Sequence, residues 1–434
     1  MEGFSKLSKE EKINWLISSM PEAGQSRELI QSFWHKDEHL QQLLDAMSEN
    51  TLTNFVLPYG IAPDFLVNGK TYHLPMVTEE SSIVAAASAA AKFWAVRGGF
   101  HSKVLSNIKS GQIHFIWKGN PDKLIELFPR LIEPLKDSAK AITTNMEKRG
   151  GGIVDIELQN LTSKIPDYFQ LTIGFATADS MGANFINSCL EIMADELKIL
   201  VSHTPDFTGQ EKEVEIIMAI LSNYCPRCLV ETWVECKLAD LKLATFELTP
   251  DEFVQKFKLA VNIAEIDIPR AVTHNKGILN GIDSVIMATG NDFRAIEAGC
   301  HAWASRNGTY GSLSKLDISS GTFRFSITLP LAVGTVGGIT NIHPLAKLSM
   351  AILGNPDAEL LMQLTSAAGL ANHFSAIRSL VTSGIQKGHM KMHLGNIMSG
   401  LNVNDNERSI MVEHFKNKTV SYSDVREFLE NLRK

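Results

Sequence analysis

The alternation of apolar and polar residues predicts one compact βαββαβ segment inside an otherwise helix-rich chain. Four runs with strand-like alternation and two with helical period follow one another between positions 109 and 221. The strands are expected at Gln112–Trp117, Gly152–Leu158, Tyr168–Phe175 and Val214–Leu221, and the helices at Pro121–Met146 and Ser180–Leu200. Asp179 is the expected N-cap of the second helix. This order is that of the ferredoxin-like motif, so the segment predicts a separate domain.

The sequence on either side of this segment is mostly helical in pattern. Helices are expected at Glu10–Ser19, Ser26–Glu49, Glu79–Arg97, Pro250–Glu265, Asn406–Phe415 and Ser423–Arg433, and from Pro344 onward generally. A strand is expected at Val230–Leu238 and a hairpin around Asp317–Gly321. The fold class is therefore α+β. Residues 1–108 and 222–385 form a large domain, 109–221 an inserted small domain, and 386–434 a helical C-terminal cap.

Composition and charge narrow the class of protein. The 434 residues exceed one compact core, and 44% hydrophobic with 21% charged residues is typical of globular proteins. A net charge of −7 speaks against a nucleic-acid partner. The polar N-terminus resembles no signal peptide, and the most apolar run, Ile83–Ala91, is too short to cross a membrane. We therefore expect a soluble, cytoplasmic protein without a membrane partner.

The cysteines favour a reducing compartment, because they are few and odd in number, five in 434 residues. Cys225 and Cys228 form a lone CxxC pair, for which structural thiols are the main interpretation and metal or redox use the alternative. No metal site is expected. His389 and His393 have the spacing of one helix face but lack a third ligand. A proton-transfer histidine and a plain polar helix surface both remain open.

Three segments could bind a cofactor or carry chemistry. The chain has neither a G-x-G-x-x-G motif nor a Walker A loop, but Asp179–Asn184 lies where a strand leads into a long helix. It predicts either a phosphate cradle or an ordinary capped helix. Lys276 and Asp292 flank an apolar stretch, which predicts that they pair with each other, as catalytic groups or as a core ion pair. Glu79 and Glu80 open an alanine-rich helix, where acidic residues often complement the helix dipole. The alternative is that the carboxyl group of one of them lies against the apolar helix and is held protonated.

Several segments together resemble the hydroxymethylglutaryl-coenzyme A (HMG-CoA) reductases, in particular the soluble bacterial and archaeal type, class II. They are Pro75–Ser88, Lys148–Gly152, Asp179–Asn187, Arg270–Asp292, Gly334–Thr340 and Gly384–Met390, in order along nearly the whole chain. The resemblance implies two hydride transfers that reduce the HMG-CoA thioester to mevalonate and free CoA. It also implies a homodimer with active sites at the interface and a C-terminal flap, and it allows a larger assembly of dimers.

The same resemblance assigns roles to residues. It implies Glu80, Lys276, Asp292 and His389 as catalytic residues: Lys276 stabilises the oxyanion, Asp292 keeps Lys276 charged, and Glu80 and His389 donate protons. Substrate contacts are implied for Ser82, Asn223, Arg270, Thr273, Asn280 and Asn372. The implied cofactor residues are Thr143, Asp179, Ser180, Met181, Gly182 and Asn184.

The cofactor prediction rests on one position. Relatives that prefer NAD carry an aspartate seven residues before the triple glycine, where this chain has Thr143, with Lys148 and Arg149 nearby. The sequence therefore predicts NADPH, with NADH possible, and the biosynthetic direction. The alternatives are NAD-dependent oxidation of mevalonate and, in another class, a non-catalytic CoA-binding homologue. The chain departs from the family pattern at Glu49–Thr53, Ser81, Ser180, Asn372 and His373.

Overall fold

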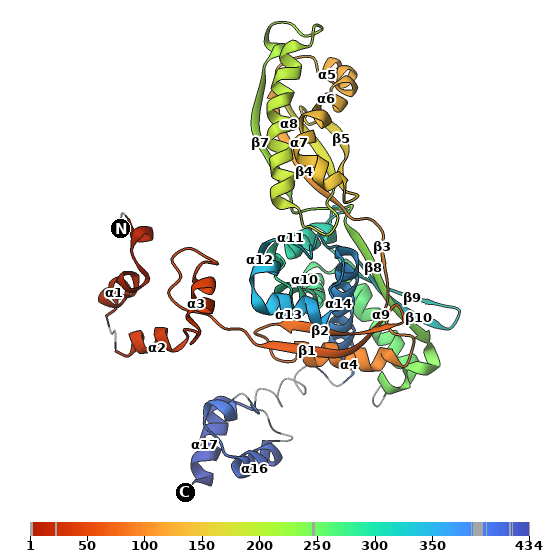
Figure 1. Cartoon of the computed structure of the whole chain (residues 1–434). Helices are drawn as coiled ribbons and strands as arrows, with labels where there is room; N and C mark the ends of the chain where they lie inside the picture. Colours follow the sequence, from red (N-terminus) through yellow and green to blue (C-terminus); the bar gives the residue numbers. More distant parts are fainter. Residues whose placement is uncertain are drawn as a thin grey trace. The chain divides into compact units, whose positions relative to one another are not determined.

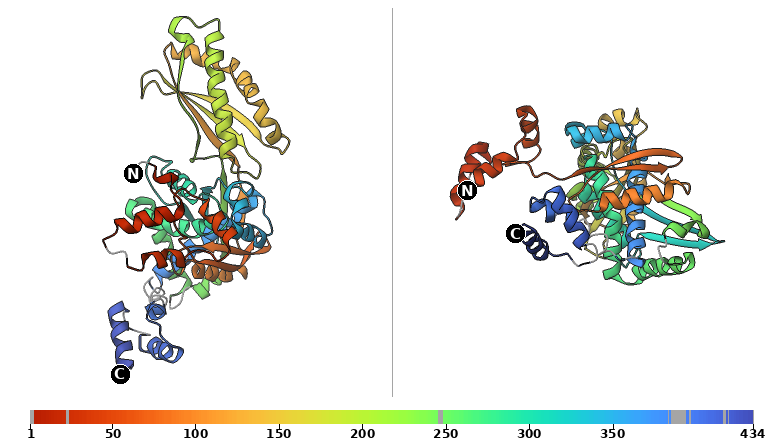
Figure 2. Two further views of the ribbon diagram at one scale, coloured as in Figure 1. Left: turned by 60° about the vertical axis from the view of Figure 1, so that its left-hand side comes forward. Right: turned by 90° about the horizontal axis from the view of Figure 1, so that it is seen from below.

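The computed structural model describes residues 3–21, 24–244, 248–382, 384, 394–395, 397–415, 418 and 420–433. The chain divides into two compact units, Met1–Pro58 and Tyr59–Lys434, and each is described by itself. Figure 1 shows the elements along the chain and Figure 2 gives two further views. His389 and His393 lie outside the described residues.

The N-terminal unit contains three short helices, α1 (Lys9–Ser19), α2 (Ser26–Ser32) and α3 (Glu38–Asp45), after a single turn of 3-10 helix at Phe4–Lys6. The helix expected over Ser26–Glu49 is thus broken in two. The reason is local: the Asp37 side chain accepts a hydrogen bond from the backbone N–H of Leu40 (3.0 Å) and starts a new helix.

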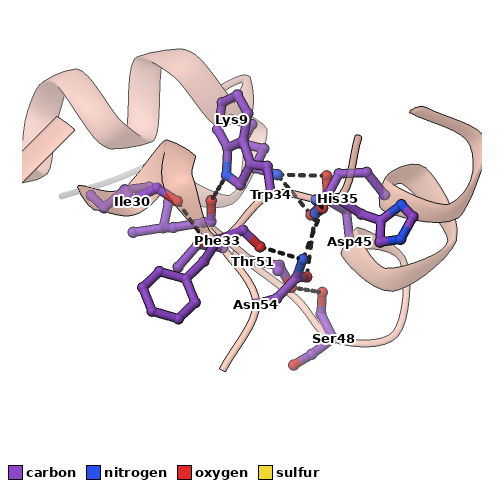
Figure 3. Close-up of polar contacts among 12 residues, drawn as sticks. Lys9, Ile30, Phe33, Trp34, His35, Asp45, Ser48, Thr51 and Asn54 are labelled. Carbon is purple, nitrogen blue, oxygen red and sulfur yellow. Dashed lines mark hydrogen bonds and ion pairs between the residues drawn. The ribbon is translucent and has the colours of Figure 1, made fainter. Parts of the chain in front are cut away.

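Polar contacts hold this unit together (Figure 3). The Lys9 ammonium lies 2.8 Å from both carboxylate oxygens of Asp45 and 4.3 Å from the ring centre of Trp34. The Trp34 indole N–H donates to the Leu52 carbonyl (2.9 Å), and the Asn54 amide donates to the Phe33 carbonyl (2.8 Å). These hydrogen bonds fix the loops where few apolar side chains are buried.

The predicted βαββαβ segment is confirmed. Its elements are β4 (Ile108–Trp117), α5 (Pro121–Leu127), α6 (Ile132–Ser138), α7 (Lys140–Glu147), β5 (Gly152–Asn160), β6 (Tyr168–Ala176), α8 (Ala183–His203) and β7 (Val214–Ser222). The strands form an antiparallel sheet in the order β5-β6-β4-β7, the ferredoxin-like arrangement. One face of α8 is buried with this sheet in a core of its own, through residues at helical spacing such as Ile186, Leu190 and Leu197.

Two local predictions in this segment are wrong. The single helix expected over Pro121–Met146 is three helices, interrupted by a 3-10 turn at Phe128–Arg130, because Pro129 cannot continue an α-helix. Asp179 is not the N-cap of α8. That position is Gly182, with φ of 85°, while the Asp179 carboxylate accepts from the backbone N–H of Ala358 (2.9 Å).

The rest of the second unit surrounds a larger core. A hairpin of β1 (Tyr59–Val67) and β2 (Lys70–Val77) and an antiparallel sheet in the order β3-β8-β10-β9 contribute its strands. The sheet contains β3 (His101–Val104), β8 (Leu229–Lys237), β9 (Ser314–Ser319) and β10 (Thr322–Pro330), which confirms the expected strand and hairpin. The helices are α4 (Ile83–Ala95), α9 (Pro250–Ile266), α10 (Ile268–Ala288), α11 (Phe293–Ala304), α12 (Gly338–Ile342), α13 (Pro344–Ile352) and α14 (Ala358–Val381), with a 3-10 segment at Leu238–Ala244.

The central feature of this core is the close packing of α10 on α14 (Figure 1). Gly281 of α10 has no room for a Cβ, because the carbonyl of Ala368 on α14 occupies that space. Gly369 of α14 lies in the same way against Ile282. Small residues thus bring two long helices together, and this contact fixes the floor of the site described below.

The C-terminal segment confirms the two expected helices. They are α16 (Asp405–Phe415) and α17 (Tyr422–Leu432), which share a small apolar cluster that includes Met411, Phe415, Val425 and Leu429. Among the helices of the described residues, none is both long enough and apolar enough to cross a bilayer.

Candidate active site

A cavity of about 570 Å³ lies against α4, α10 and α14. Helix α10 contributes Arg270, Thr273, His274, Lys276 and Asn280, because spacings of three and four residues place them on one helix face. The cavity gathers seven residues that the sequence assigns to catalysis or substrate binding: Glu80, Ser82, Arg270, Thr273, Lys276, Asn280 and Asn372.

Lys276 and Glu80 form an ion pair at this cavity, through Nζ and Oε2. Glu80 precedes α4 rather than opening it, because the helix begins at Ile83 and Ser82 is its N-cap, with φ of 78°. The expectation that Glu79 and Glu80 begin the helix is therefore wrong. The left-handed backbone of Ser82, unusual for a serine, turns the chain so that the Glu80 side chain meets Lys276.

Asp292 does not pair with Lys276 within the chain, contrary to the sequence expectation. Its side chain caps α11 by accepting from the backbone N–H of Ala295 (3.1 Å), and the Arg294 guanidinium lies 3.6 Å away. The physical reason is the length of α10, which rises about 18 Å between Lys276 and its last residue, Ala288.

Arg270 supplies a positive charge to the cavity. Burial lowers the pKa of its guanidinium, yet no ion pair of Arg270 is found in the part of the chain that the structure describes. A half-buried guanidinium of this kind suits the binding of a carboxylate ligand, which would satisfy both its charge and its planar donors.

A hydrogen-bonded triangle at the cavity was not predicted from the sequence. His274 Nε2 lies 2.7 Å from Ser314 Oγ and 2.9 Å from His373 Nε2, and the Ser314–His373 distance is 3.2 Å. All three side chains are buried. Burial lowers the pKa of His274 to about 3 and holds that of His373 well below its usual range, so both imidazoles are neutral. The one sequence signal was the departure from the family pattern at His373.

The predicted cofactor residues fall in two places. Asp179, Ser180, Met181, Gly182 and Asn184 lie together where β6 leads into α8, whereas Thr143 is buried on α7 and donates to Glu147 (2.7 Å). A Cβ on Gly334 would collide with the backbone of Met181, so these two segments of the chain approach closely only because residue 334 is glycine. No side chain caps the N-terminus of α8, which leaves its N–H groups for an anionic ligand.

Asn223 lies apart from the other predicted substrate residues. It lines a second, small cavity with Met181, Lys109 and Cys225. Cys225 and Cys228 are free buried thiols, and burial raises the pKa of Cys228 to about 12. The Cys228 thiol lies 3.3 Å from Asn107 Oδ1, a packing role that agrees with the structural interpretation of the pair.

Fold and site together define an α+β enzyme in which a lysine–glutamate pair faces a cavity and a ferredoxin-like domain is inserted in the chain. The sequence model of the family described as hydroxymethylglutaryl-coenzyme A reductase matches residues 10–394. The chain belongs to the hydroxymethylglutaryl-coenzyme A reductase family, a family of oxidoreductases.

Relatives and solved structures agree with this assignment. The chain is 36% identical to the 3-hydroxy-3-methylglutaryl-coenzyme A reductase of Archaeoglobus fulgidus, over 99% of this chain and 94% of that protein. A probable 3-hydroxy-3-methylglutaryl-coenzyme A reductase of Borreliella burgdorferi is 31% identical over 100% and 97%. The class II enzyme of Streptococcus pneumoniae bound to NADPH in open conformations has a TM-score of 0.73 and 34% identity, covering 88% of this chain and 99% of that one. The likeness confirms the predicted fold class.

Proposed function

We propose that Lys276 and Glu80 carry the reduction of HMG-CoA to mevalonate in this protein. The overall reaction consumes one HMG-CoA, two NADPH and two protons, and releases mevalonate, two NADP⁺ and CoA. The observation that supports this proposal most is the Lys276–Glu80 ion pair at a cavity that also holds Arg270. An ammonium there stabilises the negative charge that hydride attack places on the carbonyl oxygen. In its protonated form, rather than as the carboxylate of the ion pair, Glu80 donates a proton to that oxygen.

The substrate's acyl group is proposed to lie along α10. Its carboxylate binds Arg270, the one arginine of this helix, and its hydroxyl and carbonyl oxygens face Ser82, Thr273, Asn280 and Asn372. The Asn372 amide nitrogen is buried and has no hydrogen-bond partner among the described residues, so it is a donor that a substrate oxygen would satisfy. Asn223 is proposed as a further contact, from the side of the small domain.

The cofactor proposed is NADPH, with NADH as a possible substitute. NADPH supplies the two hydrides. The uncapped N-terminus of α8, with Gly182 and the close approach of Gly334, leaves room and N–H groups for a phosphate, so the residues fit a dinucleotide. Thr143, where NAD-preferring relatives carry aspartate, favours NADPH and the biosynthetic direction. The NADPH-bound Streptococcus pneumoniae neighbour supports the same choice.

The active site is proposed to be shared between two copies in a homodimer. Asp292 is part of the family's catalytic set but is about 18 Å or more from Lys276 along α10, so the Asp292 of one copy acts on the Lys276 of the other. His389 is proposed to protonate the departing CoA thiolate. The C-terminal helices α16 and α17 form the flap that brings this histidine to the site.

The domain division is proposed as 1–108 and 222–385, 109–221, and 386–434. Three separate clusters of buried apolar residues support it, one in each proposed domain. A cytoplasmic location is proposed because all five cysteines are free thiols, as is typical of a reducing compartment.

The proposed roles are tested by NADPH oxidation, followed by absorbance with HMG-CoA as substrate. Lys276→Ala is expected to lower kcat by roughly 100- to 1000-fold, as the loss of a preorganised oxyanion partner does. Lys347→Ala, an exposed lysine on α13, is the matched control and should leave the rate unchanged. Unaltered turnover in Lys276→Ala would refute the assigned role.

A further inference from the structure

A buried lysine of the small domain lies beside the segment proposed to hold the cofactor. Lys109 is on β4 and pairs with Phe175 of β6, so it is close to the point where β6 leads into Asp179–Asn184. The residue is fully buried, with 1% of its surface exposed. Neither the proposed catalytic roles nor the proposed substrate contacts involve it.

The Lys109 side chain lies on the face of β4 that packs against helix α8. Buried residues alternate along this strand, and Lys109 and Gly111 are both on its buried side. A Cβ on Gly111 would collide with Leu190 of α8, so the buried side faces this helix. Lys109 also lines one small cavity together with Met181 and Ile186, which lie at the beginning of α8. The ammonium group is therefore close to the N-terminal end of the helix.

Little within the protein balances the charge of this ammonium group. It donates one hydrogen bond, to Asn107 Oδ1 (2.7 Å), and no carboxylate within ion-pairing distance is found among the described residues. Asp179 and Glu359 act on it only from farther away. The Asp179 carboxylate already accepts from the backbone N–H of Ala358 (2.9 Å). Burial lowers the pKa of the ammonium group, because a buried charge without a counter-ion is unfavourable.

The beginning of α8 carries a second positive charge that nothing balances. No side chain caps this helix, and its first turn contains no acidic residue. The free N–H groups and the dipole of a helix together amount to roughly half a positive charge at its N-terminus. Two positive groups at one place favour an anion more than either group alone. A phosphate at the beginning of α8 would satisfy both the helix and Lys109.

We propose that Lys109 is the buried counter-charge of the diphosphate group of NADPH. The small cavity has a volume of about 10 Å³, enough for about one water molecule. The diphosphate therefore stays at the end of α8, and Lys109 acts on it through its charge from inside the domain. The inference deepens the proposed function and rests on it, because NADPH is the proposed cofactor. It assigns Lys109 an effect on the affinity for the cofactor and none on hydride transfer.

The expected effect is a loss of cofactor affinity when the charge is removed. A unit charge about 10 Å from a phosphate changes a dissociation constant by roughly 10- to 20-fold at an effective dielectric constant of about 20. Salt in the buffer screens part of this interaction, so the Kd for NADPH should rise roughly 5- to 20-fold.

Fluorescence titration of the full-length protein with NADPH, in the absence of HMG-CoA, measures this affinity. Lys109→Met keeps the length of the side chain and removes its charge, so the Kd should rise roughly 5- to 20-fold. Lys198→Met, at an exposed lysine of the same helix α8, is the control and should change the Kd less than about twofold. Because the buried charge has no counter-ion in the free protein, Lys109→Met should unfold at the same denaturant concentration as the wild type or at a higher one.

The variant Asn107→Ala separates the charge of Lys109 from its hydrogen bond. It removes the acceptor of that bond and leaves the charge, so it should change the Kd for NADPH less than about twofold. If Lys109 served only to hold the strand through this bond, Asn107→Ala and Lys109→Met would lower the stability alike and would change the Kd alike. That result would overturn the proposal.

Inorganic diphosphate tests the same charge without the nicotinamide. Titration calorimetry should show that it binds Lys109→Met more weakly than the wild type, by a factor similar to that for NADPH. If the wild type binds diphosphate in this Lys109-dependent way but does not bind NADPH, the proposed cofactor is wrong and the role of Lys109 stands. Equal Kd values of the wild type and Lys109→Met for both ligands would overturn the inference, whatever the turnover of Lys276→Ala.

Discussion

The buried histidine pair predicts a specific loss of stability in acid. His274 and His373 are each 1% exposed and lie 2.9 Å apart through their Nε2 atoms, so the folded protein keeps both neutral. In the unfolded chain each takes up a proton near the ordinary pKa of about 6.5. Because the folded-state pKa values are depressed, the stability is fully present above about pH 6.5 and is lost as the pH falls below it.

The size of this loss follows from the linkage relation. At pH 5, protonation of each histidine stabilises the unfolded state by about 2 kcal/mol of free energy, and the two together stabilise it by about 4 kcal/mol. Asp283 works in the opposite direction, since its pKa is raised to about 8 and it favours the folded state as the pH falls. The histidine contribution must therefore be measured as a difference between proteins that share Asp283.

The comparison is between the wild type and the variant His373→Asn. Asparagine is the residue that the family pattern has at this position. Free energies of unfolding come from denaturant titrations between pH 7.5 and pH 5 at one protein concentration. Between pH 7.5 and pH 5, the free energy of unfolding of the variant should fall by about 2 kcal/mol less than that of the wild type. For His203→Asn, at an exposed histidine at the end of α8, the free energy of unfolding should fall as much as that of the wild type. Parallel curves for the wild type and His373→Asn would refute a neutral buried pair.

Three further predictions concern substrate, cofactor and core. Arg270→Ala should raise the KM for HMG-CoA roughly 10- to 100-fold, because a charge-assisted contact to the carboxylate is lost; steady-state kinetics measure this, and an unchanged KM would contradict the role. Gly334→Ala should raise the KM for NADPH more than that for HMG-CoA, because the added Cβ meets the Met181 backbone. Gly400→Ala, with open space around residue 400, is the control. Equal effects of Gly334→Ala on both KM values would contradict the assignment. Phe257→Ala should lower the free energy of unfolding by about 3–5 kcal/mol, because Phe257 packs among Phe323, Phe325 and Phe374; a loss under about 1 kcal/mol in a urea titration would contradict this core role.

The fold was predictable where local pattern decides it. Buried and less buried residues alternate strictly along β4, and buried residues form a stripe on α8. These two patterns identified the ferredoxin-like order, because the buried side chains of both elements face one core. Breaks that depend on single residues were missed, such as the turn at Pro129 and the cap at Asp37. Both signals are present in the sequence, but the apolar periodicity around them outweighed them in the prediction.

The candidate site was less predictable than the fold. The family resemblance named the α10 residues, and the cavity gathers them, but the sequence did not predict the helix whose spacing places them on one face. The partner of Lys276 could not be found from the chain order, since Glu80 reaches it only through the unusual backbone of Ser82. The contacts among His274, Ser314 and His373 join three elements far apart in sequence, and no local pattern encodes such a meeting.

Subunit complementation tests most directly the central proposal, that Lys276 of one copy acts with Asp292 of another. Lys276→Ala and Asp292→Asn chains, each inactive alone, are mixed, unfolded and refolded together in equal amounts. Half of the dimers are then mixed, and each mixed dimer has one site with both groups intact, so about a quarter of the wild-type NADPH oxidation rate should return. A rate no higher than that of the separate variants, with mixed dimers shown to have formed, would contradict the shared site.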